Sequence, residues 1–160
     1  MIARRKEEGF TLIELMIVIA VIGMLAFPGL EHVRTVAKLT GVQTNYRSVT
    51  TEISGFKANE SVAEKLTALF GDSANPNVED MTNPITQNTG VATAMDFPNE
   101  PSAAVYVLVE GEATVVPSEN EHPGYKGAVV AIVHTDNSVV VYGCDEVGKL
   151  MPGLQMTIQR

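Results

Sequence analysis

An almost unbroken apolar run near the start of the chain limits what the sequence can fold into. The run extends from Phe10 to Leu30, 21 residues, which as an α-helix measures about 31 Å at roughly 1.5 Å per residue. This length matches the hydrocarbon core of a bilayer, about 30 Å thick, so the run predicts a membrane-spanning helix. One residue does not fit. Glu14 places a carboxylate in the run, and an unpaired charge in lipid costs about 3 kcal/mol.

The position of Glu14 allows two explanations. The carboxylate could snorkel to the headgroups, because it lies close to the start of the helix. Alternatively, a cut between Gly9 and Phe10 would create a terminal amine one helical turn from Glu14, at the same membrane depth. The amine and the carboxylate could then pair within one chain or between neighbouring chains, and a pair between chains would hold an assembly together.

The segment from Gly9 to Glu14 (GFTLIE) resembles the processing site of type IV pilins and of the pseudopilins of type II secretion. The resemblance combines a charged leader, a Gly-Phe junction, a carboxylate at the fifth mature position and an apolar helix. It extends from about Arg4 to Leu30 and fades beyond. It implies that a prepilin peptidase cuts after Gly9, that Phe10 becomes the N-methylated terminus, and that Glu14 neutralises the amine of a neighbouring subunit during assembly.

The resemblance also implies an organisation and a set of partners. Residues 1–9 would be the cleaved leader, residues 10–30 the transmembrane and fibre-core helix, and residues 31–160 a globular pilin head that includes the second half of the long helix. The subunit would lie in the inner (cytoplasmic) membrane with its N-terminus in the cytoplasm, as the basic leader also favours, and then enter an extracellular fibre. Its partners would be copies of itself, the prepilin peptidase, membrane lipid, and an inner-membrane assembly platform with its ATPase.

Two residues weaken the apolar helix. Pro28 has no N–H group and its ring crowds the carbonyl of Met24, while Gly23 lowers the helix propensity. These residues predict either a simple curve or a hinge that melts as the subunit leaves lipid and joins a fibre. Pilins resemble this chain in having a helix-weakening Gly and Pro in the region, although the proline here comes about one turn earlier.

Beyond residue 30 the pattern becomes that of an amphipathic helix. Apolar residues recur at spacings of four and three, which places them on one helical stripe: Val42, Tyr46, Val49, Ile53 and Phe56. One helix is therefore expected from Phe10 to about Phe56. A second, short helix is expected over residues 59–70, where Ser61 and Glu64 have the spacing of a capping box.

The last third of the chain predicts a sheet. β-Branched runs indicate strands over residues 104–110, 113–116, 127–134, 138–142 and 154–158. The strands at 127–134 and 138–142 flank a turn at residues 135–137 and are expected to form a hairpin. Residues 71–102 are rich in Asn, Pro, Thr and Gly and predict a loop with a little strand near residues 91–95. We expect an α+β fold, in which a long N-terminal helix covers one face of a C-terminal antiparallel sheet of about four strands. Pilins have this fold.

No group of residues predicts catalysis, a cofactor or a metal ion. His32, His122 and His134 lack metal-ligand spacing, and no phosphate loop or nucleophile motif occurs. Calcium ligation by the polar loop at residues 119–122 is conceivable, but a solvated turn is the better explanation. The net charge of −8 disfavours nucleic-acid binding by the head. We therefore expect a protein that is not an enzyme.

The chain has one cysteine, Cys144, which excludes a disulfide within the chain. Many pilins of Gram-negative bacteria close their C-terminal region with a disulfide, so the adhesive role of that region cannot be transferred here. We expect Cys144 to be a small, half-buried residue at the end of a strand.

These features together predict the structural subunit of a type IV pilus, a major or major-like pilin. A pseudopilin of type II secretion is one alternative, and a minor pilin or a binding module displayed on a fibre is another. A solitary membrane-anchored sensor leaves Glu14 unexplained. Adhesion, twitching motility, DNA uptake, protein secretion and electron transfer are all compatible with such a subunit.

Overall fold

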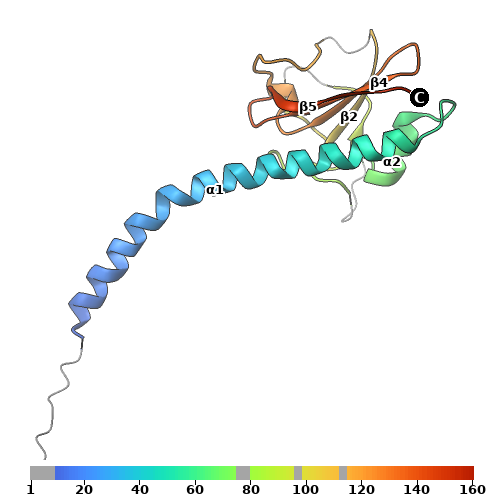
Figure 1. Ribbon diagram of the computed structural model, residues 1–160. Helices are drawn as coiled ribbons and strands as arrows, with labels where there is room; N and C mark the ends of the chain where they lie inside the picture. The colour runs from blue at the N-terminus through green and yellow to red at the C-terminus, as the bar shows by residue number, and fades with distance from the viewer. Residues whose placement is uncertain (1–9, 75–79, 96–98, 112–114) are drawn as a thin grey trace, which may run out of the picture. The chain divides into compact units, whose positions relative to one another are not determined.

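The computed structural model describes residues 10–74, 80–95, 99–111 and 115–160, with the backbone alone at residues 26–29. Contacts divide the chain into two compact units, one up to Val36 and one from Ala37 onward, and each is described by itself. The elements follow the order α1 (Leu12–Gly55), α2 (Val62–Phe70), β1 (Val91–Ala92), β2 (Val105–Val109), η1 (Pro123–Tyr125), β3 (Val129–Val133), β4 (Val139–Cys144) and β5 (Leu150–Ile158), as Figure 1 shows.

Helix α1 confirms the prediction of one long helix. It begins at Leu12 and ends at Gly55, and its backbone stays helical through Gly23 and Pro28. Among the described residues it is the one helix that is long and apolar enough to cross a membrane, judged by length and composition. Whether the hinge at Gly23 and Pro28 melts stays a prediction, because melting concerns a fibre.

The sheet of the second unit differs from the antiparallel sheet of about four strands that we expected. It has five strands in the order β1-β2-β3-β4-β5, and it is mixed: β1–β2 and β2–β3 are parallel, β3–β4 and β4–β5 antiparallel. The reason is the connection between β2 and β3. A tight turn at Gly111 would have produced antiparallel neighbours, but the chain runs on to residue 128 and returns to the same end of the sheet.

Of the individual strands, the predicted hairpin is confirmed. In it the His134 N–H donates to the Ser138 carbonyl, 2.9 Å away, and Asn137 adopts a left-handed φ of 69°, which Asn tolerates better than most residues. The strand expected over residues 113–116 is wrong for Val115 and Val116, which lie in no strand. Residues 113 and 114 are outside the described part of the chain.

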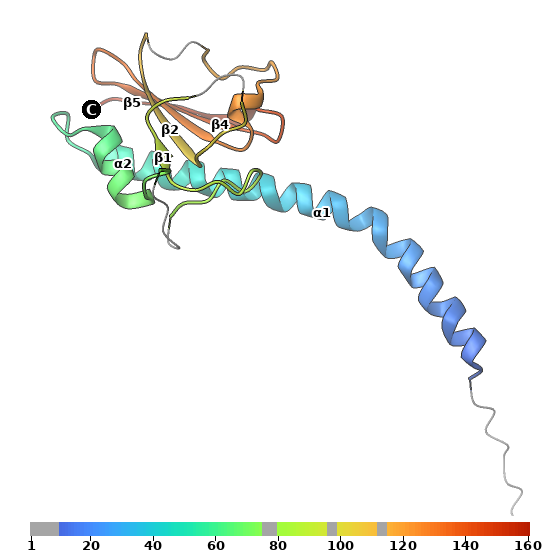
Figure 2. The ribbon, with the colours of Figure 1, turned by 180° about the vertical axis from the view of Figure 1, so that it is seen from behind.

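The face of the sheet toward α1 holds the larger core. The predicted stripe is confirmed: Tyr46, Val49 and Ile53 are buried against the sheet, and Phe56 packs at the margin. Helix α2 adds Val62 and Leu66, and Figures 1 and 2 show it on the same side of the sheet as the end of α1. The N-cap of α2 is also as predicted, since the Ser61 hydroxyl accepts the Glu64 N–H.

The opposite face of the sheet is buried as well, which the expectation of a single covering helix did not include. Tyr106, Tyr142 and Cys144 pack there with Tyr125 of η1, so the β2–β3 connection supplies the cover. Nearly continuous apolar strands are typical of sheets buried on both faces. Cys144 is consequently fully buried rather than half-buried. Burial, followed by the nearby Asp145 charge, raises the pKa of its thiol to about 12.

Candidate functional site

The first turn of α1 is closed by a reciprocal cap between Thr11 and Glu14. The Thr11 backbone N–H and hydroxyl both donate to Glu14 Oε2, at 2.8 and 2.7 Å. The Glu14 N–H donates back to the Thr11 hydroxyl oxygen at 3.3 Å. This is the geometry of a capping box, and it explains why the helix begins at Leu12 and leaves Phe10 and Thr11 outside it.

The cap gives Glu14 a partner within its own chain. Hydrogen bonds to a charged acceptor are stronger than those between neutral groups. A carboxylate that accepts two of them is easier to accommodate in an apolar helix than one without partners. The carboxylate of Glu14 therefore has donors from its own chain, without a new terminal amine.

Thr11 is the residue that the sequence reasoning missed at this site. The signal was present, because Thr11 and Glu14 have the same Thr/Ser-x-x-Glu spacing that identified the cap of α2. In an apolar run the charge of Glu14 is a stronger signal than its local hydrogen-bonding role.

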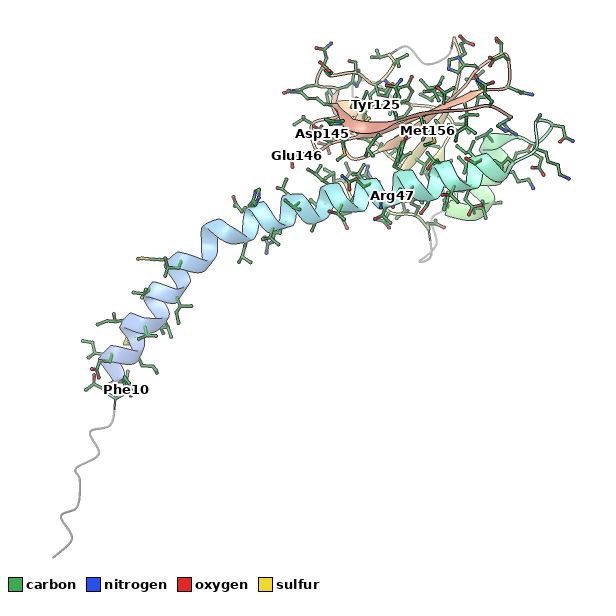
Figure 3. The ribbon with its side chains drawn as sticks, in the orientation of Figure 1. Phe10, Arg47, Tyr125, Asp145, Glu146 and Met156 are labelled. Atoms are coloured by element: carbon green, nitrogen blue, oxygen red, sulfur yellow. The ribbon has the colours of Figure 1, made fainter. Side chains whose placement is uncertain are left out.

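The expected processing position lies beside this cap. Phe10 is 89% exposed and lies ahead of the helix, and Figure 3 places it at the start of α1. Gly9 lies outside the described residues, so the predicted cut and the methylation of Phe10 stay predictions. The structure thus brings Thr11 and Glu14 together and sets Phe10 next to them along the chain.

The apolar part of α1 is not covered by any other described residue of its own unit. Its described large apolar side chains are all between 49% and 89% exposed; they are Phe10, Leu12, Ile13, Leu15, Met16, Ile17, Val18, Ile19, Val21, Ile22, Met24 and Leu25. A Cβ placed on Gly23 would meet no described atom within 4 Å, so close packing against the described part of this unit does not require that glycine. A helix that is apolar on all sides needs lipid or other helices around it.

The head offers little that resembles a reaction centre. The described residues contain no group of three His, Cys, Asp or Glu side chains placed to hold a metal ion. In the predicted polar loop, Glu121 pairs with Lys149 at 3.2 Å. The carboxylate of Asp145 accepts the N–H groups of Val147 and Lys149, both at 2.9 Å, and so organises the β4–β5 turn. These charges have structural partners.

Comparison with known protein families gives a match near the start of the chain. Residues 4–29 match the family described as the prokaryotic N-terminal methylation motif. The match includes Gly9, Phe10, Thr11 and Glu14 and ends one residue after Pro28. No curated protein and no solved structure matches the chain.

Proposed function

We propose that this chain, which carries the prepilin signature of type IV pilins and pseudopilins, is the structural subunit of a type IV pilus, a major or major-like pilin. One observation carries the proposal: the methylation motif includes the start of a helix whose apolar side chains are exposed on every side. The signature is that of structural proteins rather than of enzymes. Together with the apolar helix it indicates membrane anchoring followed by entry into a surface fibre.

In the proposed mechanism the subunit inserts with its leader in the cytoplasm. A prepilin peptidase cuts after Gly9, Phe10 is methylated, and the Thr11–Glu14 cap holds the carboxylate while the subunit waits in lipid. The assembly platform and its ATPase then move the subunit into the fibre. There the Glu14 carboxylate exchanges the Thr11 donors for the terminal ammonium group of a neighbouring subunit.

The exchange of partner matters because the other contacts give little preference for the fibre. Lipid tails are as apolar as the side chains of a neighbouring helix, so burying the apolar helix in a fibre gains little from the hydrophobic effect. Close packing between helices and the pairing of charges must supply the difference. We propose that Gly23 serves the close packing, because it presents no side chain, and that Gly23 and Pro28 form the hinge.

A pseudopilin of type II secretion is the second candidate, because it carries the same signature. A major pilin, a minor pilin and a pseudopilin differ in whether the chain forms surface fibres and in how much of each fibre it makes up. Electron microscopy of sheared cells separates them. Long fibres composed mainly of this chain support the proposal, fibres that contain only traces of it indicate a minor pilin, and the absence of surface fibres indicates a pseudopilin.

The intact mass of the cell-associated protein tests the processing step directly. We expect the mass of residues 10–160 with one added methyl group. A chain that retains residues 1–9 would overturn the proposal, because neither the terminal ammonium group nor its pairing with Glu14 could then exist. The fibre would serve adhesion, motility or DNA uptake.

A further inference from the structure

The two edges of the five-stranded sheet are protected to different degrees. At the β1 edge, the Val91 N–H donates to the Gly71 carbonyl at 2.8 Å, and the Ser73 N–H donates to the Val91 carbonyl at 3.2 Å. At the β5 edge, Leu150 donates its N–H to the Ser118 carbonyl at 2.7 Å. Further along β5, from Gln155 onward, no described backbone segment covers the edge.

The hydrogen-bond alternation shows which groups on β5 point outward. The His134 N–H donates to the Ser138 carbonyl, and the Cys144 N–H donates to the Ala128 carbonyl. In an antiparallel pair every second residue bonds the same neighbour, so the even-numbered residues of β4 direct their backbone N–H and C=O groups toward β3. The residues between them, such as Val141, therefore face β5 and pair with its even-numbered residues. It follows that the N–H and C=O groups of Gln155 and Thr157 point away from the sheet. They make no hydrogen bond to any described residue.

The side chains of this edge are unusual in an acidic protein. The chain carries a net charge of −8, yet residues 150–159 contain no charged side chain. Met156 is 49% exposed, whereas Leu154 and Ile158, on the same face of the strand, pack against the core. Figure 3 shows Met156 on β5. Open edges normally carry charges, prolines or bulges that prevent pairing. β5 has Pro152 and a register shift near its start, but residues 155–159 have no such protection.

We propose that the outer edge of β5 pairs antiparallel with the same edge of a second copy of this chain, so that two five-stranded sheets become one. With Met156 opposite its own copy, Gln155 faces Thr157 of the second copy, and the outward donors and acceptors of both strands meet. Met156 then occupies a non-hydrogen-bonded pair, in which the two Cα atoms are about 4.5 Å apart and the side chains are in contact.

A second copy fits this edge better than an unrelated strand for two reasons. The segment complements itself under a two-fold rotation, because no like charges oppose each other and the exposed Met156 side chains cover one another. Two copies of an acidic chain repel each other over most of their surfaces, so an uncharged edge is where they approach with the least repulsion.

This contact goes beyond the proposed function, since fibre assembly does not need it. A two-fold contact cannot repeat along a helical fibre, whose successive subunits are related by a screw operation. The β5 pairing would therefore join heads of two different fibres side by side, or two subunits that are not assembled.

The pairing is tested by cysteine cross-linking of the mature full-length chain in detergent. Met156→Cys is compared with Leu69→Cys on α2, because the two side chains are almost equally exposed, at 49% and 51%. Cys144 is buried and does not compete. Under mild oxidation we expect Met156→Cys to form covalent dimers roughly tenfold faster than Leu69→Cys, because pairing raises the effective concentration of the thiol. Equal rates, or cross-links from Met156→Cys to a different protein in cells, would overturn the proposal.

A second variant tests the edge without a reactive group. Thr157→Lys places a positive charge close to the two-fold axis, while Thr51→Lys adds the same charge on the exposed side of α1. In sedimentation velocity we expect the dimer fraction to fall with Thr157→Lys and to stay unchanged with Thr51→Lys. A dimer that both variants form equally would place the contact elsewhere. Both measurements use the subunit in detergent and do not require fibres. They therefore test the β5 contact even if the chain turns out not to form a pilus.

Discussion

The apolar half of α1 and the head use the same kinds of residues in opposite ways. Ile17 in the apolar helix is 58% exposed, whereas Ile53, on the same helix but within the head, is fully buried. The head contains its own partners, because two layers of cover bury both faces of its sheet. Among the described residues of its unit, the apolar helix has no such cover. The head is therefore stabilised by its own contacts, whereas the stability of the apolar helix depends on what surrounds it.

The same substitution made in both regions should have very different effects on the stability of the head. Ile53→Ala creates a cavity in the core and should lower the free energy of unfolding of the head by about 2–5 kcal/mol. Ile17→Ala should change it by less than about 0.5 kcal/mol, because that side chain is exposed and belongs to the other unit. Urea unfolding of the mature chain in detergent measures both. Similar losses for the two variants would mean that the apolar helix belongs to the folding unit of the head.

The next largest effect concerns the charge in the apolar helix. Glu14→Ala removes the acceptor of both the cap and the proposed pair between subunits, so the fibre yield should fall roughly tenfold or more. Cleavage and the stability of the head should not change. Glu31→Ala, an exposed carboxylate beyond the apolar run, is the matched control. Quantifying the subunit in sheared fibres and in membranes measures the effect, and a normal yield for Glu14→Ala would remove its assigned role.

A smaller effect isolates the cap. Thr11→Val keeps the shape of the side chain but removes the hydroxyl that bonds Glu14 in both directions, and it should destabilise the first turn by about 1 kcal/mol. Amide hydrogen exchange at Glu14 should become faster, while exchange in the head stays as it was. Thr11→Ser should restore slow exchange. If Thr11→Val exchanges like the parent chain, the cap does not hold the helix start.

The smallest effect is a pH dependence of the head. A hydrogen bond from the Thr135 N–H, and next one from His134, lower the pKa of Glu110. A carboxyl whose pKa is lower in the folded state stabilises the fold above its unfolded value of about 4.3. That stability is lost as the pH falls through the folded-state pKa. Urea midpoints measured from about pH 7 to about pH 3 should therefore decline less in Glu110→Gln than in the parent chain. Parallel declines would show that Glu110 contributes nothing.

Local patterns explain which parts of the fold the sequence predicts. The spacing of Tyr46, Val49 and Ile53 predicts which side of α1 is buried. The turn residues Asp136 and Asn137 predict where the chain reverses between two strands. The parallel pairing of β2 with β3 depends on the path of the connection between them, which no local pattern contains. The unbroken apolar runs of β3 and β4 are typical of a sheet that is buried on both faces. The apolar stripe of α1, by contrast, predicted that only one face of the sheet is covered.

The candidate site divides in the same way. The motif from Gly9 to Glu14 is local and was found from its residues, and the family match at residues 4–29 includes it. The role of Thr11 is also local but was hidden by the more conspicuous charge of Glu14. The open edge at Gln155 and Thr157 could not be found from the sequence, because an edge exists only once the order of the strands is known.

The complete burial of Cys144 has a chemical consequence for the proposed fibre, in which many copies of the chain would lie side by side. Oxidants and disulfide exchange act on the thiolate, and a thiol with a pKa of about 12 that no solvent reaches is almost never a thiolate at neutral pH. Neighbouring copies in such a fibre could therefore share an oxidising environment without becoming linked through Cys144. The chain has no second cysteine for a disulfide within the head, and the burial of Cys144 also protects against one between copies.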